Sequence, residues 1–180
     1  MRMTAAALER LLHEQHPKIR AVCLRILGNH ADADDAAQEA LIRISRSIDS
    51  FDGRSNVNTW VYRIATNAAL DELRRRSRRP LSLVDGDPNR PDPTGEAAFA
   101  RIDSSGSLDA ALAAIPDEYR VAMVLRDVAD LDYDEIAEVL GVPGGTVRSR
   151  IARGRGRLAD ILGNPGDPPQ RQTSEPGRRP

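Results

Sequence analysis

Residues 132–161 read DYDEIAEVLGVPGGTVRSRIARGRGRLADI, and the architecture of the chain can be worked out from this stretch. Asp132, followed three positions later by Glu135, forms a capping box that starts a short helix, and Gly141 ends that helix. After a tight turn, a second helix is expected to begin near Gly144 or Gly145. Two helices joined by a tight glycine-containing turn are typical of a helix-turn-helix, whose second helix enters the major groove of DNA.

The expected second helix is densely basic. Its apolar side is expected to hold Val147, Ile151, Leu158 and Ile161, and its other sides carry Arg148, Arg150, Arg153, Arg155 and Arg157. No acidic residue follows until Asp160, so the sequence predicts a positive surface with nothing to neutralise it. This surface favours DNA binding over an ordinary solvated helix face. Glycines 144, 154 and 156 each cost about 1 kcal/mol against alanine in a helix, so this helix is expected to fray without DNA.

The composition favours an all-α fold. Hydrophobic residues make up 40% of the 180 residues but aromatic residues only 3%, so the core must be built from aliphatic side chains, which suits helices. The net charge of −1 hides a segregation, because residues 1–80 and 148–180 have an excess of arginine while residues 81–147 have an excess of acids. Two basic segments flanking an acidic one favour two separate contacts with a polyanion.

Several classes of site are not expected. The single cysteine, Cys23, excludes an internal disulfide and a multi-cysteine zinc site, and it is expected to be buried and inert. His13 and His16 lie one turn apart without a third ligand at helical spacing, so no metal is expected. No apolar run approaches the ~20 residues needed to cross a bilayer, and the N-terminus lacks a signal-peptide pattern. A cytoplasmic protein without membrane insertion is therefore predicted.

Three helices are expected in the N-terminal part, at about 4–27, 32–48 and 57–79. Pro17 is expected to kink or divide the first. Asp32 is the expected N-cap of the second helix and Ser55 that of the third.

Two exposed surfaces are expected on these helices. On the second helix, Gln38, Glu39 and Ile42 are expected to be exposed and to suit protein docking. The third helix ends in an arginine cluster at positions 74–79 that exceeds what its dipole requires. Its exposed side is expected to carry Asn58, Tyr62, Arg63, Asn67, Asp71 and Arg74.

Residues 80–106 are rich in proline and acidic residues and lack periodicity, so they are predicted to form a flexible linker. A helical pattern resumes at Ser107, and Pro116 is expected in the first turn of the following helix. These helices and the helix-turn-helix make a second, four-helix module. The tail beyond residue 163 is too rich in proline and glycine to fold alone.

Three runs in fixed order support a family resemblance. They are DADDAAQEALIRI at 32–44, TWVYRIATNAALDELRRR at 59–76, and IPDEYRVAMVLRDVADLDYDEIAEVLGVPGGTVRSRIARGRGRL at 115–158. In this order they resemble a bacterial extracytoplasmic-function sigma factor of the sigma-70 family. The resemblance covers most of residues 8–162.

The resemblance implies two small helical domains joined by a flexible linker. Sigma region 2 is expected at 5–79, the linker at 80–106, region 4 at 107–162 and a disordered tail at 163–180. It further implies that the protein binds the β′ and β subunits of core RNA polymerase and directs initiation at specific promoters. A cognate anti-sigma factor is implied as a further partner.

The resemblance also assigns site residues. The surface expected to dock on the β′ clamp helices comprises Asp35, Gln38, Glu39 and Ile42. The loop expected to capture a flipped base of the minus-ten element comprises Arg54, Ser55 and Asn56. The helix expected to flank the opened strand presents Asn58, Arg63, Asn67, Asp71 and Arg74, and Arg75 is expected to neutralise phosphate. The residues expected to read the minus-thirty-five element are Thr146, Arg148, Ser149 and Arg153.

Other function classes are less well supported by the residues. A stand-alone helix-turn-helix regulator would bind duplex DNA without polymerase, usually as a dimer, and no dimerisation helix is evident. An enzyme is not expected, because the sequence contains no Gly-rich phosphate loop, no nucleophile with a base partner and no metal-ligand set. Neither a cofactor nor a small-molecule substrate is expected.

Overall fold

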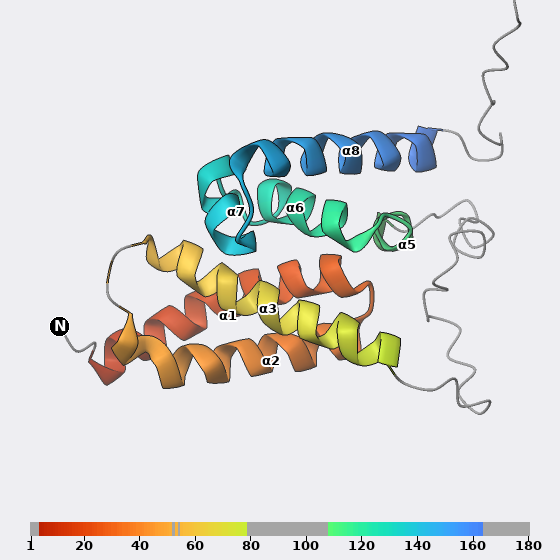
Figure 1. Cartoon of the computed structure of the whole chain (residues 1–180). Helices are drawn as coiled ribbons and strands as arrows, with labels where there is room; N and C mark the ends of the chain where they lie inside the picture. The colour runs from red at the N-terminus through yellow and green to blue at the C-terminus, as the bar shows by residue number, and fades with distance from the viewer. Residues whose placement is uncertain (1–3, 52, 54, 79–107, 164–180) are drawn as a thin grey trace, which may run out of the picture.

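The computed structural model describes residues 4–51, 53, 55–78 and 108–163. Every regular element among these residues is a helix, which confirms the predicted all-α class (Figure 1). The predicted linker at 80–106, Arg54 and residues 164–180 of the predicted tail lie outside the described residues. None of the described helices is both long and apolar enough to span a bilayer.

The first helical group contains α1 (Ala5–Leu27), α2 (His30–Ser47), the short 3-10 helix η1 (Ile48–Ser50) and α3 (Val57–Arg78). Pro17 lies inside α1 and does not divide it, contrary to one of the two outcomes expected. Burial of Ile19, Val22 and Ile26 against neighbouring helices offsets the backbone hydrogen bond that proline removes. Gly28 then ends α1 in the left-handed conformation, at φ 74°.

The predicted caps of α2 and α3 are both wrong by a few residues. Asn29 caps α2, because its Oδ1 accepts a hydrogen bond from the Asp32 backbone N–H at 2.9 Å. Asn56 takes the capping position of α3, where its carbonyl accepts from Trp60 N–H at 3.1 Å and its Oδ1 accepts from Asn58 N–H at 3.0 Å. In each case the asparagine directly precedes the first residue of the helix, so its side chain can accept from an N–H group of the first turn.

The second group contains α5 (Leu108–Ala113), α6 (Asp117–Asp127), α7 (Tyr133–Leu140) and α8 (Gly144–Gly163). The predicted capping box of Asp132 and Glu135 is confirmed, as is the left-handed Gly141 at the end of α7, with φ 64°. The predicted start of α8 at Gly144 is also confirmed. Pro116 occupies the N-cap of α6, one position outside the predicted first turn.

The two groups are packed on each other around a shared core (Figure 1). Helix α3 lies against α7, and α1 lies against α5 and α6. One buried cluster combines side chains of both groups, among them Ile19, Val22, Val61, Ala65, Val124, Leu125, Ile136, Val147 and Ile151. A smaller cluster under α5, α6 and α8 contains Ala111, Leu112, Ile115, Met123 and Ile161.

Tyr62 is only 5% exposed, although it was expected on the open side of α3. The second group covers this part of α3, and a burial of that kind cannot be read from the periodicity of α3 alone. Leu158 is half-buried rather than fully buried on the apolar side of α8.

Candidate nucleic-acid interface

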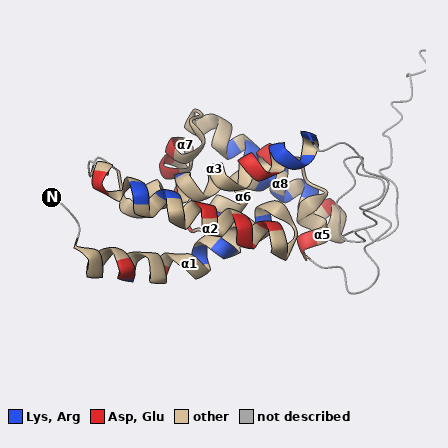
Figure 2. Cartoon of the chain, turned by 90° about the horizontal axis from the view of Figure 1, so that it is seen from below, with Lys and Arg blue, Asp and Glu red and all other residues tan. Residues whose placement is uncertain are grey.

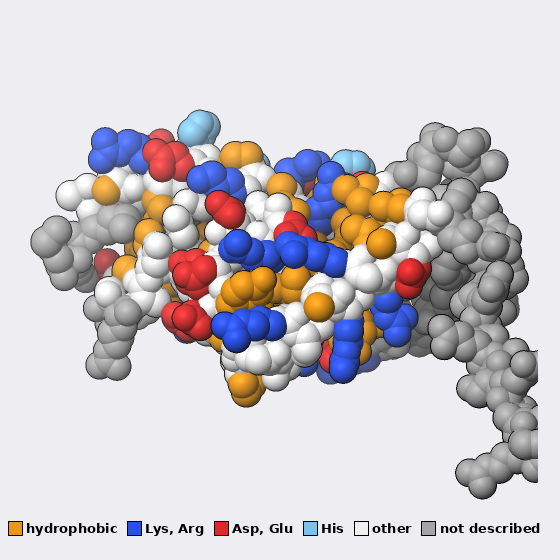
Figure 3. Space-filling model, turned by 90° about the horizontal axis from the view of Figure 1, so that it is seen from above, with side chains coloured by type: hydrophobic (Ala, Val, Ile, Leu, Met, Phe, Trp, Pro, Cys, Tyr) orange, Lys and Arg blue, Asp and Glu red, His pale blue; other side chains and the backbone are white. Residues whose placement is uncertain are grey.

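The arginines of α8 give the surface of the second group a basic character (Figure 3). Two of them are neutralised, contrary to the prediction. Arg150 Nη2 lies 3.5 Å from Glu118 Oε2, and Arg155 forms an ion pair with Asp127. The hydrogen bond from Arg155 to Asp127 raises the pKa of the Arg155 guanidinium. Both carboxylates belong to α6, so they are remote from α8 in sequence.

The other three arginines lie over tyrosine rings. The Arg148 Cζ is 5.6 Å from the centre of the Tyr133 ring. Arg153 and Arg157 share the Tyr119 ring, with Cζ distances of 5.9 and 5.7 Å. Within the described part of the chain, none of these three forms a salt bridge. Their positive charge therefore stays available on the exposed side of α8. Sequence reasoning misses the contacts with Tyr119, because this residue lies 34 positions before Arg153 in the chain.

Gly154 brings α8 close to α6. It is buried, and a Cβ at this position would lie 3.1 Å from the Tyr119 carbonyl oxygen. The prediction that Gly154 merely weakens the helix therefore misses its packing role. At Gly156, by contrast, no atom lies within 4 Å of where a Cβ would stand. The close approach at Gly154 places the Tyr119 ring beneath Arg153 and Arg157.

The other predicted recognition residues are near the start of α8. Thr146, Ser149 and Arg153 are spaced by three and four positions and so follow one face of the helix. Ser149 and Arg153 are exposed and Thr146 is half-buried. The Ser149 hydroxyl donates a hydrogen bond to the Thr146 carbonyl at 2.9 Å. Arg148, also exposed, lies beside this face.

On α2, the structure exposes Asp35, Gln38 and Glu39 at the surface, while Ile42 is half-buried rather than exposed as expected. The acidic residues of this helix lie in its first part and its basic residues, Arg43 and Arg46, in its last part (Figure 2).

Arg43 connects the predicted docking surface of α2 to the predicted DNA-flanking side of α3. Its Nε lies 2.7 Å from Glu39 Oε1 and its Nη1 lies 3.2 Å from Asp71 Oδ2. These hydrogen bonds raise the pKa of the Arg43 guanidinium. Asp71 in turn pairs with Arg74 at 3.0 Å. Arg43 was missed at the level of sequence, where its i,i+4 spacing from Glu39 was the one available signal.

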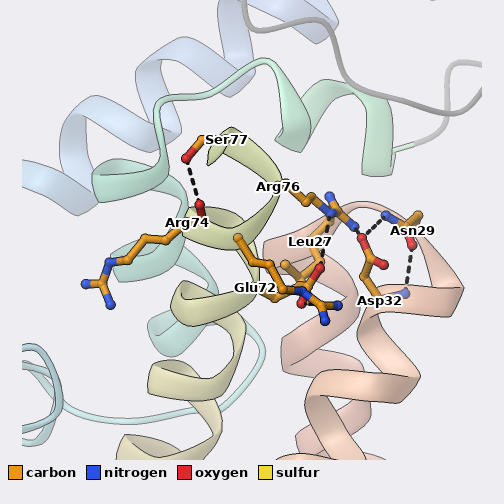
Figure 4. A network of polar contacts seen from close by, with 8 residues as sticks. Leu27, Asn29, Asp32, Glu72, Arg74, Arg76 and Ser77 are labelled. Atoms are coloured by element: carbon orange, nitrogen blue, oxygen red, sulfur yellow. Dashed lines mark hydrogen bonds and ion pairs between the residues drawn. The ribbon is translucent and has the colours of Figure 1, made fainter. Parts of the chain in front are cut away.

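The arginine cluster at the end of α3 is divided between two roles (Figure 4). Arg76 is structural, because its Nη1 donates to the Leu27 carbonyl at 2.9 Å and its guanidinium also pairs with Asp32. Arg75 is exposed and pairs with the buried Glu72 at 2.6 Å, which raises the pKa of Arg75. Arg74 and Arg78 are exposed as well.

Several predicted minus-ten residues lie where the two groups meet. Arg63 Nη1 is 3.7 Å from Glu138 Oε1, and next to it the buried Thr59 hydroxyl donates to Glu135 Oε1 at 2.9 Å. The Asn58 Oδ1 accepts a hydrogen bond from the Gln15 amide at 3.1 Å. An open cleft of about 600 Å³ lies here, lined by residues that include Gln15, Lys18, Asn56, Asn58, Tyr62, Asp130 and Glu135. Asn67 is exposed, and Ser55 is half-buried.

The remaining candidates for a chemical site are groups of metal-ligating side chains and the single cysteine. Within the described ranges, no group of three His, Cys, Asp or Glu side chains could hold a metal ion. Cys23 is buried, and desolvation raises the pKa of its thiol to about 12. Such a thiol carries almost no thiolate near neutral pH, which fits the prediction of an inert residue.

Two family models match the chain. Residues 11–79 match sigma-70 region 2, and residues 105–158 match sigma-70 region 4. The chain is 38% identical over 157 residues to the ECF RNA polymerase sigma factor SigE of Mycolicibacterium smegmatis, covering 86% of this chain and 61% of that protein. It is 37% identical over 157 residues to the ECF sigma factor SigW of Bacillus subtilis, covering 81% of this chain and 83% of that protein.

Solved structures show the same fold. The sigma factor RpoE of Bartonella quintana, in complex with the anti-sigma factor NepR, has a TM-score of 0.68 at 24% identity, covering 86% of this chain and 96% of that one. CnrH, in complex with the cytosolic domain of CnrY, has a TM-score of 0.59 at 19% identity, covering 89% of this chain and 90% of that one.

Proposed function

The chain belongs to the sigma-70 family and is an extracytoplasmic-function alternative sigma factor that directs transcription initiation, and on this premise we propose how its surfaces divide the work. Region 2, at residues 5–79, binds core RNA polymerase and the minus-ten element. Region 4, at residues 107–162, binds the minus-thirty-five element. The proposed role is one of binding in the cytoplasm, and the polymerase supplies the chemistry.

The proposed minus-thirty-five contact is carried by one observation, the division of the α8 arginines. Arg150 and Arg155 are paired with carboxylates, whereas Arg148 and Arg153 keep their charge and are exposed beside Thr146 and Ser149. An unpaired, exposed guanidinium can form the forked contact with guanine that gives ~1 to 3 kcal/mol of base discrimination. These four residues are therefore the proposed reading surface.

The proposed minus-ten contact uses the start and the outer side of α3. Ser55 and Asn56 offer polar groups for an extruded base, whose unstacking costs a few kcal/mol. Exposed Asn58, Asn67 and Arg74 and half-buried Arg63 follow along the helix and flank the opened strand together with Asp71. Arg54 belongs to this proposal by resemblance alone.

Core polymerase is proposed to dock on the α2 surface formed by Asp35, Gln38, Glu39 and Ile42. The ion pairs from Glu39 to Arg43 and from Arg43 to Asp71 support a link between this surface and the minus-ten surface.

The two groups must separate for both elements to be bound at once. By their names, the elements lie about 25 base pairs apart, or about 85 Å at 3.4 Å per base pair. A compact body of this size has a radius of gyration of about 14 Å, so the packed arrangement cannot span that distance. The packed arrangement also places α7 over Thr59 and beside Arg63.

An anti-sigma factor is the proposed inhibitory partner. Support comes from the structural relative RpoE, which was solved with the anti-sigma factor NepR.

Reconstitution with bacterial core polymerase tests the proposal. Promoter-selective initiation is the expected result, and binding to an intact inverted repeat without polymerase would instead identify a stand-alone regulator. In the same assay, Arg153→Ala should weaken discrimination at the minus-thirty-five element. Arg75→Ala should weaken binding evenly across promoters and flatten its salt dependence, because a phosphate contact carries no base information. Identical behaviour of the two variants would contradict these assignments.

A further inference from the structure

We infer that Tyr119 and Tyr133 are positioning residues that hold the reading arginines of α8 ready for DNA without neutralising them. This inference rests on the proposed minus-thirty-five contact and adds the groups that prepare it. Tyr133 positions Arg148, and Tyr119 positions Arg153 together with Arg157.

The partners of the α8 arginines differ in kind. Arg150 and Arg155 meet carboxylates, which offset their charge and accept hydrogen bonds from some of their N–H groups. Arg148, Arg153 and Arg157 meet the faces of aromatic rings. A ring face attracts a cation through its quadrupole and, unlike a carboxylate, carries no full negative charge that would cancel the charge of the arginine. On α8, only the second kind of partner leaves the positive charge of the arginine uncancelled.

Both tyrosine rings are held in place by contacts with other parts of the second group. Tyr133 is the first residue of α7, directly after the Asp132 capping box. A second guanidinium, that of Arg126, lies 5.5 Å from the same ring centre and donates to the Leu131 carbonyl at 2.7 Å. Tyr119 is partly buried and packs against the cluster that contains Met123 and Ile161, and the buried Gly154 of α8 approaches its backbone closely. Neither ring can therefore move far without disturbing a helix start or a helix contact.

Fixed rings reduce the entropy that arginines lose on binding. An arginine that is free to sample all its rotamers loses part of that freedom when it is immobilised at an interface, whereas a pre-placed one loses less. The Arg153 Nη1 also lies 3.4 Å from the Tyr119 hydroxyl, which further restricts its guanidinium.

The same geometry assigns a DNA contact to Arg157. It is exposed, lies one helical turn beyond Arg153 on the same ring, and has an open position at its neighbour Gly156. Its place toward the C-terminal end of α8, away from the residues proposed to read bases, suits a phosphate rather than a base edge.

The test compares Tyr133→Leu with Tyr133→Phe, and Tyr119→Leu with Tyr119→Phe, in holoenzyme reconstituted with core polymerase. The readout is the ratio of affinities for promoters with an intact and a substituted minus-thirty-five element, measured across salt concentrations. Each leucine variant should lower this ratio about two- to fivefold, as expected for the loss of one exposed cation–π contact. Tyr133→Phe, which keeps the ring, should retain the ratio, and Tyr119→Phe, which keeps the ring but loses the hydroxyl contact with Arg153, should retain most of it. The salt dependence should not change, because every arginine remains.

Further variants separate this inference from the proposed function. Arg148→Gln should lower the ratio, whereas Arg150→Gln and Arg155→Gln, which remove carboxylate-paired arginines from the same helix, should lower it much less. An unchanged ratio for Arg148→Gln would contradict the minus-thirty-five assignment itself.

The positioning role is overturned by any of three results. One is an effect of Arg148→Gln without an effect of Tyr133→Leu. Another is an equal loss for the leucine and phenylalanine variants. The third is a leucine variant that binds intact and substituted promoters equally poorly and melts at a lower temperature, because the tyrosines would then support only the fold.

Discussion

Gly154 and Gly156 are identical residues two positions apart in α8, yet their surroundings give them opposite effects on stability. The backbone of α6 packs against Gly154, whereas Gly156 faces open space. Helix propensity therefore determines the effect of a methyl group at one position, and packing determines it at the other.

Replacing Gly156 with alanine should raise the free energy of unfolding by up to about 1 kcal/mol, because alanine restricts the unfolded backbone at no steric cost. Gly154→Ala should give no such gain and should destabilise the protein, since the new methyl group would lie 3.1 Å from the Tyr119 carbonyl oxygen. Thermal and urea unfolding of the two variants measure the difference. Equal stabilisation by both changes would show that α6 and α8 can move apart freely.

Arg76 is the second residue whose role depends on its surroundings. Arg76→Ala should lower the free energy of unfolding by about 1–3 kcal/mol, because part-buried acceptors lose a charged donor. These acceptors include the Leu27 carbonyl and the Asp32 carboxylate. Arg78→Ala is the matched control, as an exposed residue on the same turn region, and should change stability by less than about 0.5 kcal/mol. Urea unfolding distinguishes them, and a similar loss in both would remove the structural role from Arg76.

Among the elements, α7 and the start of α8 are the parts that the sequence predicts best. Their determinants are local: Asp132 and Glu135 mark one end of α7 and Gly141 marks the other. The predicted cap of α2 lies three residues late, because Asn29 and Asp32 are both good caps and sequence does not rank them. The local signals for the start of α2 are therefore present in the sequence but ambiguous.

The site was predicted less completely than the fold. The basic surface of α8 follows from its arginines, but their division into paired and unpaired groups depends on Glu118, Asp127 and Tyr119 of α6. These partners are about thirty residues away and meet α8 only through tertiary packing. The burial of Tyr62 was missed for the same reason.

The contribution of the capping box to the stability of α7 can be tested by substitution at Asp132. Asp132→Ala should lower the free energy of unfolding by about 0.5–2 kcal/mol, because the backbone N–H groups of Asp134 and Glu135 lose their acceptor. Asp132→Asn should preserve most of the stability, since asparagine caps helices comparably well. Hydrogen exchange of the α7 amides measures the local effect. Fast exchange in the asparagine variant as well would mean that charge, rather than capping, is what matters.

For the whole molecule, the contact between α3 and α7 should control how readily the two groups separate. The variant Thr59→Val with Glu138→Arg removes one hydrogen bond and places a like charge beside Arg63. It should destabilise the packed arrangement by about 1–2 kcal/mol, from one buried hydrogen bond and one exposed ion pair. The closed population should fall accordingly.

Energy transfer between dyes at Ser45→Cys on α2 and Ala159→Cys on α8 reports this separation, because the buried Cys23 thiol, with its pKa raised to about 12, reacts poorly. The loosened variant should show lower transfer than the parent in the free protein, and binding to core polymerase and promoter should lower transfer in both. Glu14→Arg, a charge reversal at an exposed position on α1, should leave transfer unchanged. Transfer that stays high in the initiation complex would contradict the need for separation.

The buried cluster that runs through both helical groups also affects how long the protein lasts in the cell. Separation divides the aliphatic cluster that both groups share, and exposing apolar side chains to water is unfavourable. We expect a molecule without polymerase to resist proteases best while its two groups are packed together. A molecule released from a transcription complex should be sensitive to proteases until the two groups pack together again. The degradation rate would then rise with the fraction of molecules that have left polymerase without repacking. The amount of this sigma factor would thereby follow the supply of free core polymerase.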